Sequence, residues 1–134
     1  MCIFCKVVNN EIPHHKFYED DKVIAFLDIK PVNPGHSLVI PKKHYASIEE
    51  ISEEDLAAMV LAAKKVGRLL KERLGAEAYN IVLNNGVAAG QVVMHLHFHV
   101  IPRHTGDGHV FWPHSDYAPG EADEVFNKLI SPLN

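Results

Sequence analysis

Cysteine is scarce in this sequence, because its 134 residues contain two, Cys2 and Cys5. Two cysteines so close together cannot staple distant parts of a chain, which excludes a disulfide-stabilised scaffold and leaves metal binding or redox chemistry as their uses. Long apolar runs are also missing, and none approaches the roughly 18 residues of a membrane-spanning helix. The N-terminus has no basic region followed by a long apolar segment, so we expect a cytoplasmic protein.

An excess of basic residues is missing as well. The chain has 13 Lys and Arg against 17 Asp and Glu, a formal net charge of −4, which disfavours binding to a nucleic acid backbone. A small anionic ligand remains possible because it needs only a local patch. The composition, 47% hydrophobic and 22% charged, is that of a globular protein, and no repeat or linker divides the sequence. We therefore expect a single domain over residues 1–134.

One long helix is predicted over residues 53–74, where apolar side chains recur at helical spacing. Ser52 is its predicted N-cap, Ile51 and Leu56 are spaced for a hydrophobic staple, and Gly75 marks its end. Shorter helices are predicted over residues 3–8 and 121–130, and strands over residues 17–19, 23–28, 37–41, 79–84 and 92–101. This order predicts an α+β fold, a mainly antiparallel sheet with the long helix packed on one face.

Histidine is abundant, with ten copies, and three of them alternate with apolar residues in the segment His95-Leu96-His97-Phe98-His99. In a strand, alternate side chains point to the same face, so the three imidazoles would lie at intervals of roughly 6.6 Å. Leu96 and Phe98 would then face the core beneath the long helix. The histidines would occupy the opposite, more accessible face.

Two chemistries use such a row of histidines. The imidazoles can hold a catalytic zinc ion, or a neutral imidazole can attack phosphorus while its neighbours bind the anion. Residues 86–90, which begin and end with glycine, offer backbone N–H groups as a phosphate cradle, and the Gln91 amide follows them. The alternative without chemistry is a strand face exposed to solvent.

The run from His95 to Ile101 resembles the signature of the histidine triad (HIT) family, and Gly90-Gln91 precedes it as in that family. Similar residues recur in order in the segments Ile12-Pro13, Glu19-Asp20-Asp21, 26–31, Pro34-Gly35-His36 and 38–44. The resemblance covers residues 3–103, while residues 104–134 diverge. It implies a HIT-like fold and a homodimer, and the helix predicted over residues 121–130 would form a C-terminal helical tail.

The resemblance also implies a nucleotidyl hydrolase or transferase that cleaves the α-phosphoryl bond of purine nucleotide conjugates. His97 would be the nucleophile that forms a nucleotidyl-histidine intermediate, His99 would hydrogen-bond the phosphate, and His36 would complete the cluster. A histidine with an ordinary pKa is mostly neutral at cytoplasmic pH, which leaves one ring nitrogen free to attack.

Further residues match substrate-binding positions of the family. Asp28 would accept hydrogen bonds from the ribose hydroxyls, and Asn84 and Gln91 would supply amides near the phosphate or ribose. Asp28 and Asn84 are also typical turn residues. Four apolar residues match the base pocket but suit a core equally well, and they are Ile3, Phe4, Phe26 and Ile29.

The cysteine pair needs two more ligands if it holds a structural zinc ion, because such sites are tetrahedral. Some bacterial HIT proteins, and the related galactose-1-phosphate uridylyltransferases, resemble this chain in ways that imply the set Cys2, Cys5, His44 and His95. The first triad histidine would then bind metal, leaving the other two for chemistry. A redox dithiol and a pair of small buried residues remain the alternatives.

The sequence departs from the nucleotide-binding branch of the family at Val92, where that branch has serine, and this leaves open whether adenosine phosphoramidates or dinucleoside polyphosphates are cleaved. Trp112-Pro113 matches a segment that reaches the partner subunit in that branch.

His104, His109 and His114 have no counterpart and are interpreted as exposed loop residues. Two other functions stay open, a zinc hydrolase with the three alternating histidines as ligands and a non-enzymatic nucleotide-binding or docking protein.

Overall fold

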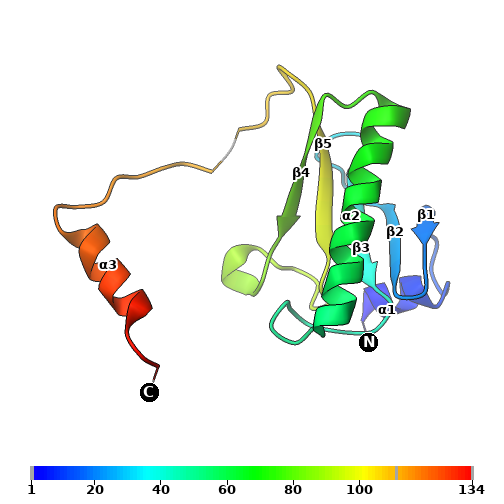
Figure 1. Ribbon diagram of the computed structural model, residues 1–134. Helices are drawn as coiled ribbons and strands as arrows, with labels where there is room; N and C mark the ends of the chain where they lie inside the picture. Colours follow the sequence, from blue (N-terminus) through cyan, green and yellow to red (C-terminus); the bar gives the residue numbers. More distant parts are fainter. Residues whose placement is uncertain (1, 111, 134) are drawn as a thin grey trace.

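The computed structural model describes residues 2–110 and 112–133. These residues form one five-stranded antiparallel sheet with strand order β1-β2-β3-β5-β4, and α2 lies across one of its faces (Figure 1). The predicted α+β architecture is therefore confirmed. The elements in chain order are α1 (Ile3–Val8), β1 (Lys16–Glu19), β2 (Val23–Leu27), β3 (Ser37–Pro41), α2 (Glu53–Leu74), β4 (Ala78–Leu83), a 3-10 turn η1 (Val87–Ala89), β5 (Phe98–Arg103) and α3 (Glu121–Ile130).

The long helix α2 begins and ends where its sequence predicts. The Ser52 hydroxyl accepts a hydrogen bond from the Asp55 N–H at 3.2 Å, and Gly75 ends the helix with φ of +70°, a conformation that costs glycine little. Its buried face, which includes Met59 and Val66, packs on a core cluster that contains Leu96, Phe98 and Val100. These three residues therefore face α2, as the alternation predicts.

The central strands β2 and β3 are buried on both faces of the sheet, and all five residues of β3 are buried. A second apolar cluster contains Phe4 and Val7 of α1 together with Phe26 of β2 and Leu38 of β3, while Val23 and Val39 belong to the α2 cluster. The short helix α1 thus covers part of the sheet face that α2 leaves free. Residues of this second cluster also line the candidate site.

The strand predicted over residues 92–101 is shorter and later than expected, because β5 begins at Phe98. The backbone before it bonds elsewhere than in a strand ladder: the Leu96 N–H donates to the Tyr45 carbonyl at 2.7 Å, and the Gln91 side-chain amide donates to the Val93 carbonyl at 3.0 Å. Only His99 of the three alternating histidines lies in a strand.

The expectation that the histidines occupy an accessible face is wrong. His95 is fully buried and His97 is 7% exposed, because α1 packs over this part of the sheet and the Phe4 ring contacts both imidazoles edge-on. A short amphipathic helix near the N-terminus thus converts an expected surface into an enclosed site.

The C-terminal part of the chain lies apart from the sheet. Helix α3 is connected to β5 by an extended segment, and none of its residues is buried (Figure 1). His104, His109 and His114 are exposed, in agreement with their interpretation as loop residues. Within the described residues, none of the helices combines the length and the apolar character needed to cross a bilayer.

Candidate active site

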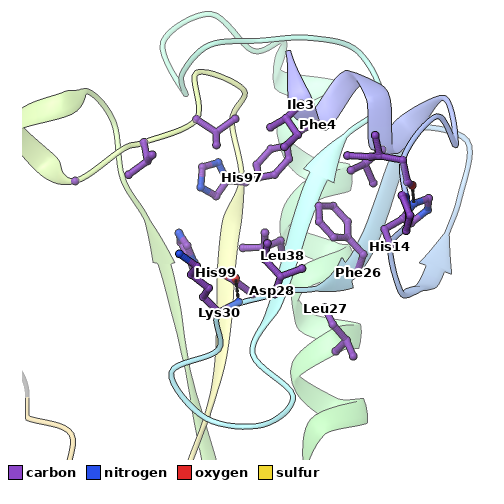
Figure 2. A pocket seen from close by; sticks show the side chains of 17 residues that line it. Ile3, Phe4, His14, Phe26, Leu27, Asp28, Lys30, Leu38, His97 and His99 are labelled. Atoms are coloured by element: carbon purple, nitrogen blue, oxygen red, sulfur yellow. Dashed lines mark hydrogen bonds between the residues drawn. The ribbon is translucent and has the colours of Figure 1, made fainter. Parts of the chain in front are cut away.

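A pocket of about 470 Å³ opens between α1, the end of β2, residues 90–93 and the triad histidines His97 and His99 (Figure 2). Its lining is mostly apolar. All four predicted base-pocket residues, Ile3, Phe4, Phe26 and Ile29, belong to it, with the Ile29 side chain 87% exposed at the mouth. Asp28, His97 and His99 are polar residues of the same lining. The pocket therefore has an apolar part that suits a flat ring system and a polar part that contains the histidines.

His97 has a defined tautomer. Its Nδ1 lies 2.7 Å from the carbonyl oxygen of His95, and because a carbonyl only accepts, Nδ1 carries the proton and the Nε2 lone pair is free. Burial lowers the pKa of His97, with the His95 carbonyl and Asp28 opposing the effect. The ring is therefore held neutral and oriented, as a nitrogen nucleophile requires.

His99 receives its orientation from a chain of hydrogen bonds that begins in the 28–36 loop. The Val32 N–H donates to Nδ1 of His36 at 3.0 Å, so His36 carries its proton on Nε2, which lies 2.9 Å from Nδ1 of His99. His99 accepts this bond and keeps its own proton on Nε2. Burial, with the neighbouring His97 and His36, lowers the pKa of His99 to about 4. At neutral pH, His99 is thus uncharged and offers the Nε2–H as a donor, while the neighbouring His97 is uncharged and offers Nε2 as an acceptor. The centroids of the two rings are 4.9 Å apart.

Asp28 has the turn role expected from its sequence context, while its contact with a ribose stays a prediction. One carboxylate oxygen accepts the Lys30 N–H at 2.9 Å and shapes the turn after β2, while the other lies 3.6 Å from Nε2 of His36. The residue also lines the pocket. A carboxylate in this position accepts hydrogen bonds from hydroxyl groups but repels phosphate, which suits a ribose more than an anion.

Gln91 is a brace rather than a pocket residue. It is 3% exposed, its Oε1 accepts the Gly86 N–H at 2.8 Å, and its Nε2 donates to the carbonyls of Ala46 and Val93 at 2.7 and 3.0 Å. These bonds occupy the amide that the sequence assigned to phosphate.

The predicted glycine cradle is likewise folded on itself. The N–H groups of Ala89 and Gly90 close turns onto the carbonyls of Gly86 and Val87, so they do not point at a ligand. Gly90, Val92 and Val93 line the pocket, whereas Asn84, just beyond β4, is not among the lining residues. The loop therefore contributes shape to the pocket more than the backbone N–H donors that were expected.

A second group of side chains meets behind the triad, and its members are Cys2, Cys5, His44 and His95. Nδ1 of His95 lies 3.4 Å from the Cys2 sulfur, 3.6 Å from the Cys5 sulfur and 3.2 Å from Nδ1 of His44, and the Cys5 sulfur lies 3.4 Å from the same His44 atom. A tetrahedron built with zinc–sulfur bonds of about 2.3 Å and zinc–nitrogen bonds of about 2.0 Å has edges of about 3.3 to 3.8 Å. The four donors fit a zinc ion.

The protonation of His95 agrees with this fit. Its Nε2 lies 2.9 Å from the Pro41 carbonyl and therefore carries the proton, so the Nδ1 lone pair faces the sulfur atoms. The three triad histidines are not one ligand set, because the groups close enough to share a metal among the described residues are this one and Asp28 with His36 and His99. In the latter group, the facing nitrogens of His36 and His99 already share a proton.

The sequence analysis missed several pocket residues. Val7 was detectable, since it lies four residues after Ile3 and one helical turn brings both to the same face of α1. Ile12, His14 and Val93 also line the pocket, and no local pattern identifies them because their position depends on how separate segments pack.

The fold is that of a histidine triad domain, and comparison with known proteins agrees. The model of the HIT domain matches residues 9–106, so the chain belongs to the HIT family. It is 54% identical over 110 residues to the uncharacterized HIT-like protein MJ0866 of Methanocaldococcus jannaschii, covering 82% of this chain and 84% of that protein. It is 42% identical over 135 residues to adenosine 5'-monophosphoramidase hnt1 of Schizosaccharomyces pombe, covering 98% of each chain.

Solved structures give the same result. The crystal structure of a HIT family member from Bacillus subtilis aligns with a TM-score of 0.85 at 38% identity and covers 99% of this chain and 97% of its own. A zinc-bound histidine triad family protein from Mycobacterium smegmatis aligns with a TM-score of 0.79 at 39% identity, covering 86% of this chain and 84% of its own.

The depressed pKa of His99 predicts a specific loss of stability in acid. Between its ordinary pKa of 6.5 and the folded value of about 4, the unfolded chain binds a proton that the folded chain refuses, so stability falls as pH falls through this window. We expect the melting temperature of the wild type to decrease more steeply from pH 6.5 to pH 4 than that of His99→Gln. His109→Gln, at an exposed histidine, is the control and should keep the wild-type slope. Equal slopes for the wild type and His99→Gln would contradict the assignment.

Proposed function

We propose that this protein is a nucleotidyl hydrolase or transferase that cleaves the α-phosphoryl bond of purine nucleotide conjugates through a nucleotidyl-histidine intermediate on His97. The observation that carries the proposal is the Nε2 lone pair of His97, made available by the bond from Nδ1 to the His95 carbonyl, in the wall of a mostly apolar pocket. The Schizosaccharomyces pombe relative named adenosine 5'-monophosphoramidase supports this class of substrate.

The proposed reaction has two displacements at phosphorus. In the first, Nε2 of His97 forms a bond to the α-phosphorus as the bond to the leaving group breaks, and the leaving group takes its proton from solvent at the pocket mouth. The imidazole becomes cationic, and the Nδ1–H bond to the His95 carbonyl strengthens with that charge. In the second, water attacks the phosphorus and releases a proton to solvent, the bond to His97 breaks, and a nucleoside monophosphate is released with the neutral histidine.

The other residues of the pocket bind and orient the substrate. The Nε2–H of His99 donates to a phosphate oxygen, and the His36 hydrogen bond keeps that proton in place. Asp28 accepts hydrogen bonds from the ribose hydroxyls. Ile3 and Ile29 enclose the base, which lies on Phe4 and Phe26. Val92 is 89% exposed at the pocket and offers no hydroxyl to an amine leaving group, so adenosine phosphoramidates and dinucleoside polyphosphates both remain in the proposal.

The nucleophile is tested with His97→Ala. We expect this variant to lose release of AMP from an adenosine phosphoramidate by about 10³-fold or more, because no other group offers the nitrogen, and to keep AMP binding, because ribose and base contacts lie elsewhere. Mass spectrometry of the wild type mixed with a slowly hydrolysed substrate should find the nucleotidyl group on His97.

His109→Ala is the control for this experiment and should retain turnover. Wild-type protein that binds AMP without turning over any conjugate would favour the non-enzymatic alternative. Near wild-type turnover by His97→Ala would exclude His97 as the nucleophile.

We also propose that Cys2, Cys5, His44 and His95 hold a structural zinc ion. When bound, the ion would supply four bonds that tie α1 to the loop after β3 and to the triad segment. The zinc-bound Mycobacterium smegmatis relative and the tetrahedral distances support the site. Its effect on chemistry would be indirect, since holding the His95 ring holds the carbonyl to which His97 donates. Thiolate ligands persist in a reducing compartment, in keeping with the expected cytoplasmic address.

The zinc proposal predicts about one zinc ion per chain in purified protein. Cys5→Ser should lower metal content and reduce the melting temperature by roughly 10 °C. Turnover should fall less than in His97→Ala. Lys6→Ser, next to the ligand on α1, should change neither property. Metal-free protein with the melting temperature of the zinc-bound form would refute the site, and loss of turnover in proportion to metal loss at constant fold would favour a zinc hydrolase.

We propose a homodimer as the working form of the protein. Val60 and Leu61 of α2 are 52% and 58% exposed, β4 lies at one edge of the sheet, and the apolar side chains of α3 lie uncovered. A ten-residue helix is marginal in water without a packing partner, so a second copy would supply the surface that α3 needs. Light scattering at micromolar concentration should give twice the chain mass of 15.0 kDa, and a mass of one chain would contradict the dimer.

A further inference from the structure

His14 lies at the side of the pocket remote from the reacting histidines. From His97, the aromatic rings follow one another across the pocket: Phe4 is 5.1 Å from His97, Phe26 is 5.6 Å from Phe4, and His14 is 6.2 Å from Phe26, measured between ring centroids. Figure 2 shows the same order, with Phe26 between His14 and His97. A nucleotide with its phosphate at His97 and its base on the phenyl rings therefore directs the edge of the base toward His14.

The hydrogen bond that His14 makes decides what it can offer this edge. Nδ1 lies 2.8 Å from the Ile12 carbonyl oxygen, so in the neutral ring Nδ1 carries the proton and Nε2 is an acceptor. The other polar side chains of the pocket, Asp28, Lys30 and the two triad histidines, are displayed on the opposite side of Phe26 (Figure 2). The pocket residues next to His14 in the chain, Ile12 and Pro13, have side chains that make no hydrogen bonds, and His14 also borders a second groove that Lys16 and Arg73 line.

Within the pocket, a single acceptor at this side distinguishes purines by their substituent at position 6. Adenine carries an amino group there, which donates, whereas guanine and hypoxanthine carry an oxygen, which accepts. Two acceptors facing each other leave both unpaired and desolvated, which costs more than the loss of one hydrogen bond. The rings stack equally well in both cases, so the apolar floor does not discriminate between them.

We propose that His14 makes this pocket selective for 6-aminopurine nucleotides over 6-oxopurine nucleotides by accepting a hydrogen bond from the 6-amino group. This inference rests on the proposed function for the direction in which the nucleotide lies, but it concerns binding and does not depend on catalysis. His14 is a specificity residue that takes no part in the displacement at phosphorus.

The test compares AMP with IMP, which differ in the substituent at position 6 and in the proton that hypoxanthine carries on N1, and which both lack the extra amino group of GMP. Binding of each free nucleotide is measured by calorimetry, and hydrolysis is measured on the matching phosphoramidates. We expect the wild type to bind AMP about tenfold more tightly than IMP, with the same ratio in kcat/KM arising from KM. In His14→Ala the ratio should fall to within about twofold, because AMP binding weakens.

Two further variants sharpen the result. His14→Gln carries an amide that rotates to accept or donate, so it should bind both nucleotides and also lose the preference. His15→Ala removes the adjacent histidine, which does not line the pocket but lines a second groove that His14 also borders, and it should keep the wild-type ratio.

The outcomes separate this inference from the proposed reaction. Selective, His14-dependent binding of AMP without hydrolysis would support the inference and overturn the reaction. Hydrolysis of both phosphoramidates with equal kcat/KM, or an AMP preference that persists in His14→Ala, would overturn the inference and leave the reaction standing. Failure to bind either nucleotide would overturn both.

Discussion

The hydrogen bond from Nδ1 of His97 to the carbonyl of His95 is the interaction on which the site depends. It decides which nitrogen of His97 carries a proton and therefore which one is available to a substrate. The carbonyl is a reliable acceptor because the ring of its own residue is held on both sides, by the Pro41 carbonyl and by the group of two cysteines and His44. The backbone and the side chain of His95 together thus hold the His97 ring in a reactive orientation.

Burial gives the histidines their second property, which is the absence of charge. His36, His97 and His99 all have lowered pKa values with desolvation as the first cause, and the carboxylate of Asp28 opposes the shift without reversing it. Neutral imidazoles have one donor and one acceptor each, so their hydrogen bonds acquire a direction that runs from Val32 through His36 to His99. The price of this order is acid sensitivity, because protonation of Nδ1 in His36 or His99 removes the acceptor of its hydrogen bond.

The irregular backbone between Gln91 and His97 allows neighbouring residues to do different work. Gln91 turns inward to fasten the loop, Val92 and Val93 shape the pocket, His95 faces the cysteines, and His97 faces the pocket. The segment is kept in this path by bonds to residues 45 and 46 and not by a neighbouring strand. Helix α1 and its N-cap complete the arrangement, because Cys2 and Cys5 approach His95 while Ile3 and Phe4 close the pocket. The cysteine–histidine group and the pocket therefore share one short helix.

The sequence by itself determined the elements with strong local signals, which are α2 between Ser52 and Gly75, strand β3 and the short helices near the two ends of the chain. It also determined the group of residues that resemble a histidine triad site. These depend on periodicity, capping and residue type, which act over a few positions. Tertiary structure alone decided that His95 and His97 are buried, that β5 starts only at Phe98, that the Gln91 amide bonds to the backbone and that His14 joins the pocket. Each of these follows from contacts between segments far apart in the chain, such as Leu96 with Tyr45 and Phe4 with His97, and a side chain's protonation and direction are set by such neighbours and not by its place in a pattern.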